Sequence, residues 1–482
     1  MTRFGDQSML IDGELTTSRD GTWIESLDPT NEEPIGRVPA GTCEDIERAV
    51  HAAHGALADW AETDMSDRAA LLRTIAAELA DRDEEIAQIE AIDTGSTIGK
   101  MRDDVRKAAR QIEFFAGLAY ELKGETVPAT ASGLHMTIRE PFGVVGRIVP
   151  FNHPIMFAAT RLAAPLIAGN ALIVKPPEQA PISSGILSEI CQRHVPAGLV
   201  NIVTGHGPVV GDAIVRHPAI RRIALTGSAA TGLAVQRAAA DVAIKNVTLE
   251  LGGKNPCIVF PDADEDAAFN AAVAGMNFAW QGQSCGSTSR LLVHESRYDA
   301  AVEAVGERVG SLVVGNPLDE ASDMGPVITH QQRDKVLELI RSGIDEGARL
   351  VTGGGVPSGL GFERGYWVEP TVFADVTPQM RIFREEIFGP VLSIIPWKDE
   401  AELIRLANET EYGLTASIWT RDLRRALQTA RGVQAGYVWI NGVSRHHRGV
   451  PFGGVKSSGL GREEHLEELL SYSEIKAINI HM

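Results

Sequence analysis

The chain has 482 residues, of which 44% are hydrophobic and 23% are charged, as in an ordinary soluble globular protein. It carries 45 basic and 64 acidic residues, and the resulting net charge of −19 argues against nucleic acid or an anionic membrane surface as a partner. The length predicts two or three lobes, and no uninterrupted apolar stretch reaches the roughly 18 residues that a membrane span needs.

The start of the chain and its cysteines bear on the cellular compartment. The first residues, Met1–Asp6, lack the apolar core of a signal peptide. The four cysteines, at positions 43, 191, 257 and 285, show no CxxC spacing and so indicate neither a disulfide framework nor a zinc site. We therefore expect a reducing, cytoplasmic location and no bound metal.

The first 120 residues are predicted to be mostly helical. Ser66 is expected to cap a helix in which Leu71, Ile75 and Leu79 recur at four-residue spacing and face a core. The segment 124–141 alternates loosely between apolar and polar residues, which indicates strands that leave the main body.

From residue 144 onward, short β-rich runs alternate with helix-length segments, which predicts a parallel sheet with crossover helices. The five runs are Val144–Val149, Leu172–Val174, Leu199–Val203, Arg222–Thr226 and Asn246–Leu249. A loop rich in Gly, Pro, Asn, Lys or Glu follows each run. Because ligands of open parallel sheets bind at the carboxyl ends of the strands, the five loops predict one binding crevice.

Three of these loops suggest chemistry, each with a plainer alternative. Gly227 and Gly232 bracket a strand-to-helix turn that suits a pyrophosphate, although the spacing is not GxGxxG and a simple glycine-rich turn is as good an interpretation. Lys175 and Glu178 are close enough to hold neighbouring hydroxyls of one ribose, or to form a surface ion pair. Asn152, between two prolines, can offer a fixed donor to an oxyanion or bond its own backbone.

A thiol and a carboxylate indicate covalent chemistry on a carbonyl. Cys285 ends the run WQGQSC among small residues, and Glu250 begins the run ELGGKNP beside a Gly-Gly turn. The thiolate can attack a carbonyl carbon, and the carboxylate can later activate water. A cysteine hydrolase is the alternative, with a histidine such as His294 as its base, but it would leave the five loops without a purpose.

From about residue 10 to the C-terminus, the chain resembles the NAD(P)-dependent aldehyde dehydrogenase superfamily. The motifs that carry the resemblance are Glu250–Pro256 (ELGGKNP), Gly282–Cys285 (GQSC), Gly365–Thr371 (GYWVEPT), Glu385–Pro390 (EEIFGP) and Pro451–Lys456 (PFGGVK). It implies an α/β fold with a Rossmann-type parallel-sheet dinucleotide-binding domain at 1–122 and 142–252. An α/β catalytic domain is expected at 253–453, and a small β oligomerisation arm at 123–141 and 454–482. In such proteins the last strand, here near Tyr472–Ile480, joins the sheet of a neighbouring subunit, so a homodimer or homotetramer is expected.

The resemblance also implies roles for individual residues. Cys285 matches the nucleophile, Glu250 the general base, and Asn152, with the backbone N–H of Cys285, the oxyanion hole. The residues that match cofactor contacts are Lys175 and Glu178 at the adenosine ribose, Gly227, Ser228 and Gly232 at the pyrophosphate, Glu386 and Phe388 at the nicotinamide ribose, and Val149, Gly207, Gly211, Thr231, Leu251 and Gln332 elsewhere.

The implied reaction oxidises an aldehyde to the carboxylic acid with NAD, through a cysteine thiohemiacetal and a thioester that water hydrolyses. Relatives that pass the acyl group to coenzyme A usually lack the glutamate that is Glu250 here, so hydrolytic release is expected. An acylating enzyme is the alternative. A non-catalytic binding or structural relative is a further alternative, but the presence of Cys285, Glu250 and Asn152 argues against it. NAD is expected rather than NADP, since Glu178 would repel a 2′-phosphate.

The substrate is expected to be a medium or bulky aldehyde, whether aromatic, long aliphatic or a semialdehyde, because Ser284 and its neighbours are small. Trp280 could stack on a ring-containing aldehyde, or it could equally be part of the core. Arg161 lies where relatives that oxidise semialdehydes bind the distant carboxylate, but Ala279 replaces the second arginine of that clamp.

The basic segment 441–448 would border the substrate tunnel by analogy with the family. Its Arg445 and His446 could supply a different cation or a polar contact to the substrate. A solvated loop at the tunnel mouth is the alternative.

Overall fold

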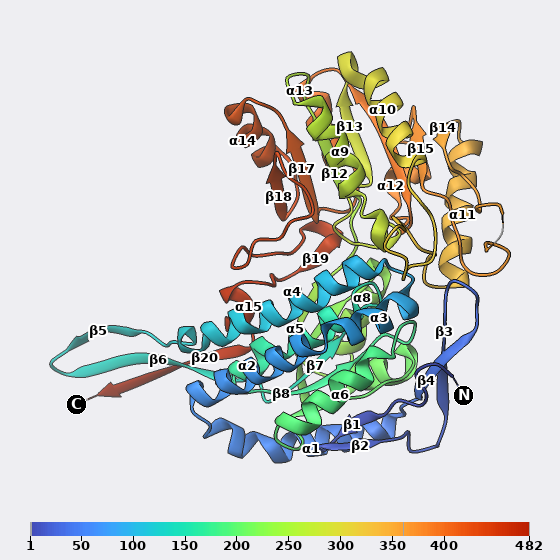
Figure 1. The fold of residues 1–482 in the computed structure, drawn as a ribbon. Coiled ribbons are helices and arrows are strands. Elements are labelled where there is room, and N and C mark those ends of the chain that lie inside the picture. Colours follow the sequence, from blue (N-terminus) through green and yellow to red (C-terminus); the bar gives the residue numbers. More distant parts are fainter. Residues whose placement is uncertain (1, 360, 482) are drawn as a thin grey trace.

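Two α/β lobes lie one above the other, and a β arm projects from the lower lobe (Figure 1). The structure is a computed structural model that describes residues 2–359 and 361–481. None of the described helices is both long and apolar enough to cross a membrane.

The lower lobe is built on an eight-stranded sheet with the order β19-β11-β10-β7-β8-β9-β1-β2. Its five central parallel strands confirm the predicted β-rich runs: β7 (Val144–Ile148), β8 (Ala171–Lys175), β9 (Val200–Ile202), β10 (Ile220–Thr226) and β11 (Asn246–Glu250). The helices that connect them are α5 (Pro154–Ile167), α6 (Ser183–His194), α7 (Asp212–Arg216) and α8 (Ala229–Ala240).

The direction of strand addition reverses between β7 and β10. From β7 the chain adds β8 and β9 on one side, and it then returns to add β10 and β11 on the other. Because crossovers are right-handed, α5 and α6 cover one face of the sheet, and α7 and α8 cover the other. Such a reversal is where open α/β sheets bind ligands.

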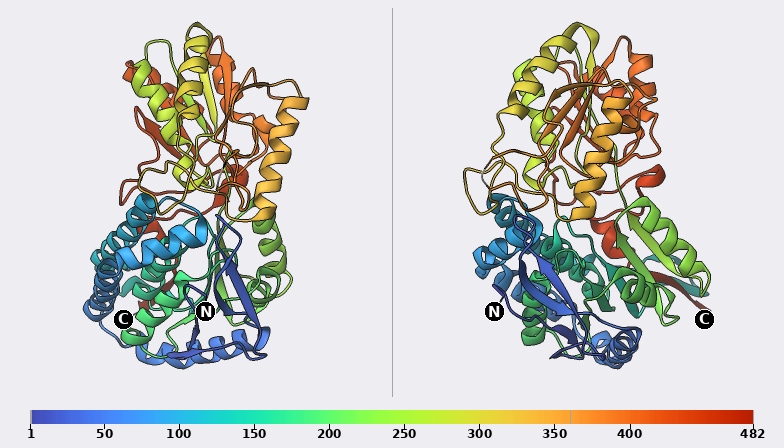
Figure 2. Two further views of the ribbon diagram at one scale, coloured as in Figure 1. Left: turned by 45° about the vertical axis from the view of Figure 1, so that its right-hand side comes forward. Right: turned by 90° about the vertical axis from the view of Figure 1, so that its right-hand side faces the viewer.

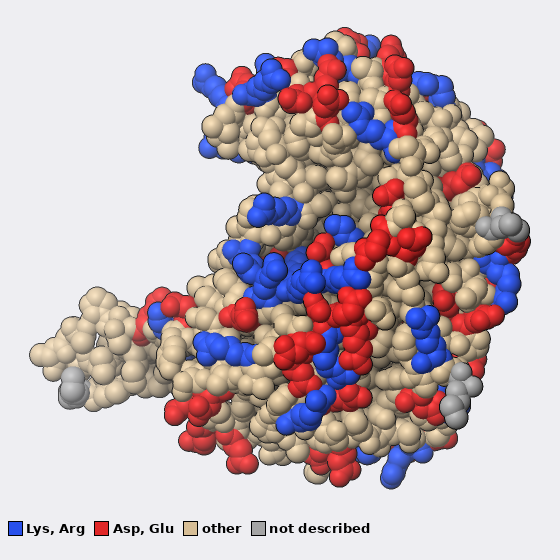
Figure 3. Space-filling view, viewed as in Figure 1, with Lys and Arg blue, Asp and Glu red and all other residues tan. Residues whose placement is uncertain are grey.

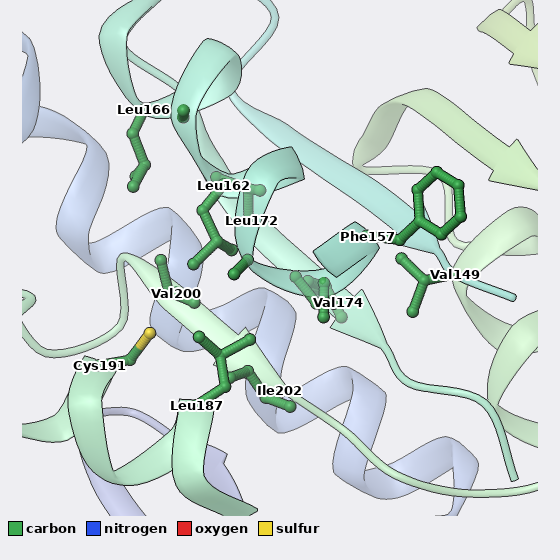
Figure 4. Close-up of a cluster of buried hydrophobic side chains, with 14 of the residues drawn as sticks. Val149, Phe157, Leu162, Leu166, Leu172, Val174, Leu187, Cys191, Val200 and Ile202 are labelled. Atoms are coloured by element: carbon green, nitrogen blue, oxygen red, sulfur yellow. The ribbon is translucent and has the colours of Figure 1, made fainter. Parts of the chain in front are cut away.

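The face of the lower sheet that α5 and α6 cover packs against these helices through a continuous apolar core. Figure 4 shows side chains of β8 and β9 packed against those of α5 and α6. The labelled side chains from these four elements are Leu172, Val174, Val200, Ile202, Phe157, Leu162, Leu166, Leu187 and Cys191. Burial of such side chains, at about 25 cal/mol per Å², holds the strand ends that carry the loops.

The N-terminal region contains strands that the sequence pattern did not predict. They are β1 (Met9–Ile11), β2 (Glu14–Thr16), β3 (Trp23–Leu27) and β4 (Pro34–Pro39), and only then come α1 (Cys43–Ala61), α2 (Met65–Asp81), α3 (Asp83–Thr94) and α4 (Ile98–Gly117). The expected cap at Ser66 is wrong, because extended backbone at Asp64 makes that residue the N-cap and places Ser66 inside the first turn. The buried face contains Leu72, Ile75 and Leu79, whereas Leu71 is partly exposed.

The upper lobe has a seven-stranded sheet with the order β14-β15-β16-β13-β12-β17-β18, and only the edge strand β14 is antiparallel. Its strands are β12 (Pro256–Val259), β13 (Arg290–His294), β14 (Arg349–Thr352), β15 (Thr371–Ala374), β16 (Val391–Trp397), β17 (Thr415–Trp419) and β18 (Tyr437–Ile440). Its helices are α9 (Glu265–Gly275), α10 (Tyr298–Gly310), α11 (His330–Asp345), α12 (Arg381–Arg384), α13 (Glu400–Asn408) and α14 (Leu423–Gly432).

The arm is a three-stranded antiparallel sheet that stands away from both lobes (Figures 1 and 2). It consists of β5 (Thr126–Thr130), β6 (Gly133–Pro141) and β20 (Ser473–His481), which confirms the predicted strands in this part of the chain. Before it, β19 (Gly459–Leu460) pairs with β11, and α15 (Leu466–Leu470) packs on α5. The C-terminal part of the arm sheet therefore begins at Ser473 and not at 454, and contact with a neighbouring subunit stays a prediction.

Candidate active site

The carboxyl ends of the lower parallel strands lie in register at one edge of the sheet. Ile148 pairs with Lys175 in β8 and with Leu225 in β10, and Thr226 pairs with Glu250 in β11. The loops that follow these strands are therefore neighbours, as the strand pattern predicted.

These loops and the upper lobe enclose a cavity of about 760 Å³. All but one of the residues predicted at the cofactor line it: Val149, Lys175, Glu178, Gly207, Gly211, Gly227, Ser228, Thr231, Leu251, Gln332, Glu386 and Phe388. Asn152, Glu250 and Cys285 line the same cavity. The exception is Gly232, where a Cβ atom would lie 2.8 Å from the Leu251 side chain, so this glycine allows α8 to approach the loop after β11.

Lys175 and Glu178 form an ion pair that lines the cavity, with 2.6 Å between Nζ and Oε2. Burial lowers the pKa of Lys175, and Glu178 partly restores it. Burial opposes the charge of Glu178 as well, but Lys175 and the Gly207 N–H, 3.0 Å from Oε1, outweigh it and lower the pKa of that carboxyl. Both side chains are therefore charged, which suits two adjacent hydroxyl groups.

The N-terminus of α8 faces the cavity and suits a phosphate group. Ser228 is the N-cap, and its Oγ accepts a hydrogen bond of 3.2 Å from the Thr231 N–H. The free N–H groups of a first helical turn, with the helix dipole, attract anions.

The opposite wall comes from the upper lobe. Glu386 Oε1 accepts a hydrogen bond of 2.8 Å from the Gly253 N–H, and Gln332 Nε2 donates to the Phe388 carbonyl at 2.7 Å. Phe388 has a left-handed backbone (φ 55°), and its ring packs edge-on against Phe151 at 5.7 Å. A side chain held in this sparsely populated backbone region is typical of functional sites.

The thiol of Cys285 reaches the cavity from the upper lobe, and Asn255 fixes its main chain. Asn255 Nδ2 donates to the carbonyls of Cys285 (2.7 Å) and Ser287 (2.9 Å), while its Oδ1 accepts from the Thr415 N–H. Sequence reasoning assigned no role to Asn255, although it lies within the ELGGKNP motif. A Cβ at Gly253 would lie 2.9 Å from the Cys285 carbonyl, so this close approach requires glycine.

Burial and two nearby carboxyl groups favour the protonated form of Cys285 over its thiolate. Burial raises the pKa of Cys285 to about 12, and the charges of Glu386 and Glu250 add to this effect. In the chain alone the thiol is therefore protonated at neutral pH, and the thiolate needs a further positive charge near it.

Glu250 is buried, and neither of its carboxylate oxygens accepts a hydrogen bond from a described residue. Burial raises its pKa well above the usual range, and Glu463 raises it further, while Arg161 and Arg147 oppose the shift. A carboxyl group with a raised pKa is a better proton acceptor near neutral pH than an ordinary one.

The structure does not show Arg161 in the position expected for a substrate ligand, because its side chain belongs to a buried group of ion pairs. It is 2% exposed, and its guanidinium pairs with Glu463 and, at 3.2 Å, with Glu468. Arg147 pairs with Glu463 at 2.7 Å and donates to Thr226 Oγ1 at 3.1 Å. The charge of Arg161 is therefore balanced inside the protein, beneath Glu250, and is not available to a substrate carboxylate.

The other substrate candidates lie outside the 760 Å³ cavity, and their roles stay predictions. Trp280 Nε1 donates to Asp104 Oδ2 at 3.2 Å, and Ser284 lines a much smaller cavity behind the thiol. Arg445 is exposed, and His446 stacks on Phe452 with ring centroids 4.4 Å apart.

The histidine needed by a cysteine hydrolase is not supplied by His294. Its ring packs on Trp397 at 4.7 Å, and its Nδ1 lies 2.9 Å from Ser296 Oγ. Within residues 2–359 and 361–481, no group of three or more His, Cys, Asp or Glu side chains is arranged to hold a metal ion.

Comparisons with known proteins agree with this geometry. Residues 15–478 match the family model described as the aldehyde dehydrogenase family. Over 481 residues the chain is 45% identical to the aldehyde dehydrogenase tropH of Talaromyces stipitatus, covering 98% of this chain and 93% of that protein. The structure is similar to the NAD⁺ complex of an aldehyde dehydrogenase from Bacillus cereus (TM-score 0.96, 37% identity, 99% and 97% of the two chains covered). It is equally similar to a betaine aldehyde dehydrogenase from Staphylococcus aureus in complex with NAD⁺ (TM-score 0.96, 34% identity, 98% and 94% covered).

Proposed function

The chain belongs to the aldehyde dehydrogenase family, and we propose that it oxidises an aldehyde to the carboxylic acid with NAD, through a thioester on Cys285 that water hydrolyses. The observation that carries the proposal is that a single cavity joins Cys285, Asn152 and Glu250 to the Lys175–Glu178 pair. A cysteine hydrolase, which binds no dinucleotide, would leave the Lys175–Glu178 pair without a function.

The cavity fits a dinucleotide. Lys175 and Glu178 would hold the adenosine ribose, the first turn of α8 the diphosphate, and Glu386 and Phe388 the nicotinamide ribose. When bound, the oxidised nicotinamide supplies a hydride acceptor and a positive charge. We propose NAD and not NADP, because Glu178 is held ionised and would repel a 2′-phosphate.

The chain's own groups perform the remaining steps. Cys285 gives its proton to solvent and Sγ attacks the carbonyl carbon, so that a C–S bond forms, the C=O π bond breaks and the carbonyl oxygen becomes an oxyanion. The Asn152 amide and the Cys285 N–H stabilise that oxyanion. Loss of hydride from this carbon then leaves a thioester.

Glu250 completes the cycle. Its carboxylate removes a proton from water while the water oxygen attacks the thioester carbon. The C–S bond breaks, the carboxylic acid leaves, and Cys285 is regenerated. The unpaired oxygens of Glu250 support hydrolysis over transfer to coenzyme A, because a general base must be free to bond water.

Aromatic side chains beside the thiol support a medium or bulky aldehyde. Cys285 packs against a cluster of Leu414, Tyr437, Trp439 and Phe452, which is called the aromatic cluster below. Large rigid rings of this kind favour apolar or aromatic substrate bodies. The projecting arm supports a homodimer or homotetramer, since its edge strands β5 and β20 are open to pairing.

The test is NADH formation, followed by absorbance with NAD, a panel of aldehydes and no coenzyme A. The variant Cys285→Ala should abolish the signal, and Cys43→Ala, which removes an exposed thiol on α1, should retain it. One equivalent of acid should appear per NADH. Persistent activity in Cys285→Ala, or dependence of the signal on added coenzyme A, would contradict the proposal.

A further inference from the structure

The segment 441–450 follows β18 and folds back over the aromatic cluster. Trp439 Nε1 donates to the Arg445 carbonyl at 2.8 Å, and the His447 N–H donates to the Tyr437 hydroxyl at 3.2 Å. Cys285 packs against the same cluster, so the cluster contacts both the residue that carries the thiol and the main chain of Arg445. The segment therefore borders the aldehyde side of the site, opposite the dinucleotide cavity.

His446 belongs to this segment, and its ring packs on the aromatic cluster. Its ring stacks on Phe452 (4.4 Å, 27°) and contacts Tyr437 (5.4 Å, 24°), whose own rings lie 5.6 Å apart, and these contacts hold its orientation. Nδ1 lies 3.0 Å from a Glu464 carboxylate oxygen. Nε2 makes no hydrogen bond with any described residue, so it remains available to a ligand.

Glu464 is the carboxylate that faces the segment, and it pairs with His446 and not with Arg445. Burial opposes its ionisation, but His446 and Lys107 outweigh burial and hold the pKa of Glu464 well below its usual range. Lys107, on α4, lies 4.0 Å from the same carboxylate. A Cβ at Gly449 would lie 3.6 Å from the Phe114 ring, also on α4, so the segment reaches from the upper lobe to this helix.

The surface around the segment 441–450 and α4 is basic, although the chain as a whole is acidic. Figure 3 shows a hollow between the two lobes, with Lys and Arg side chains gathered over α4 along its lower edge. The segment 441–450 contains two arginines, two histidines and no acidic residue. Arg445 is exposed and forms no ion pair with any described residue, in contrast to the buried and doubly paired Arg161.

We propose that the aldehyde side of this site recognises an anionic group carried by the substrate, either a carboxylate or an ionised hydroxyl, through Arg445 and Nε2 of His446. The inference rests on the proposed function and narrows its substrate class. An unpaired guanidinium and an unpaired ring nitrogen on adjacent residues provide charge-assisted hydrogen bonds. The aromatic cluster beside them holds the body of the aldehyde next to the thiol.

The test compares kcat/KM for benzaldehyde, 4-carboxybenzaldehyde and 4-hydroxy-3-nitrobenzaldehyde, whose acidic hydroxyl is ionised at neutral pH. The ratio of each anionic aldehyde to benzaldehyde is measured in wild type, Arg445→Gln, His446→Phe and the control Arg19→Gln, which removes an exposed charge from the turn between β2 and β3. Comparing the same pair of aldehydes across variants cancels their different intrinsic reactivities. The anionic aldehyde whose ratio falls more in Arg445→Gln identifies the carboxylate or the ionised hydroxyl as the preferred group.

We expect the ratio to fall about tenfold in Arg445→Gln, with benzaldehyde kinetics unchanged, since one charge-assisted contact is lost. The ratio should also fall in His446→Phe, which keeps the ring stack, and should stay unchanged in Arg19→Gln. In wild type it should decrease about threefold as salt rises from about 0.02 to 0.5 M, because salt screens exposed charges.

A ratio that Arg445→Gln and salt leave unchanged overturns the inference while the aldehyde dehydrogenase activity stands. Absence of NADH with all three aldehydes and with a wider neutral panel overturns the proposed function itself.

Discussion

Replacing Asn152 by alanine tests the oxyanion hole with little effect on folding. The Asn152 side chain lines the cavity and makes no hydrogen bond with another described residue, so its truncation leaves no protein group unpaired. The expected cost in stability is about 1 kcal/mol or less. In contrast, loss of one oxyanion donor reduces kcat about 10²- to 10³-fold, which corresponds to about 2.7–4 kcal/mol in the barrier.

The assay is steady-state NADH formation at saturating NAD and aldehyde, with thermal unfolding and NAD binding measured on the same samples. Gln179→Ala is the matched control, because it removes a side-chain amide from the same cavity but far along it from the thiol. Its kcat should change less than about threefold, since it makes no contact with the reacting carbonyl. Asn152→Asp should be at least as slow as Asn152→Ala, because it puts a negative charge where the oxyanion forms. A kcat within tenfold of wild type in folded Asn152→Ala, or full activity in Asn152→Asp, would refute the reasoning.

Three further predictions follow from the charged groups. Glu250→Gln should leave a pre-steady-state burst of about one NADH per site, followed by a slow steady state. In wild type, deacylation should accelerate as pH rises, because the raised pKa of Glu250 keeps its base form scarce at low pH. Stopped-flow absorbance from pH 5.5 to 9 checks both predictions, and a flat pH profile without a burst in Glu250→Gln contradicts them. Glu178→Gln should raise the NADP-to-NAD ratio of kcat/KM about tenfold by removing the repulsion, and an unchanged ratio would show that Glu178 does not select the cofactor. Arg161→Gln should lower the free energy of unfolding in urea by about 3–5 kcal/mol, because Glu463 and Glu468 lose a buried partner. A stable variant that has lost only its preference for anionic aldehydes would restore Arg161 as a substrate ligand.

The parts of the site that sequence could predict share one physical basis. Parallel strands are short apolar runs whose carboxyl ends must meet at one edge, so the sequence alone predicts that Lys175, Gly227 and Glu250 lie together. Cys285 could be joined to them only through the family resemblance, because it lies on the other lobe. The fold brings it to the same cavity.

The parts that could not be predicted depend on pairing over long distances in sequence. The partners of Arg161 lie about 300 residues away, and no local periodicity reports such a contact. A signal was nevertheless present in Arg147, a charged residue in an otherwise apolar strand, because a buried guanidinium requires a carboxylate. The strands β1 to β4 were missed because runs of three to six residues are too short for their alternation to stand out from loops.

The ion pairs beneath Glu250 have a consequence for biosynthesis. Arg147 and Arg161 belong to the part of the chain that leaves the ribosome early, whereas Glu463 and Glu468 are among its last twenty residues. Until those carboxylates are made, the nascent lower lobe would have to bury two uncompensated guanidinium groups, at a cost of several kcal/mol. The lobe that carries the base can therefore reach its final packing only after residues 463–468 have been made, so a chain that stops short of residue 463 is less stable than one that contains them.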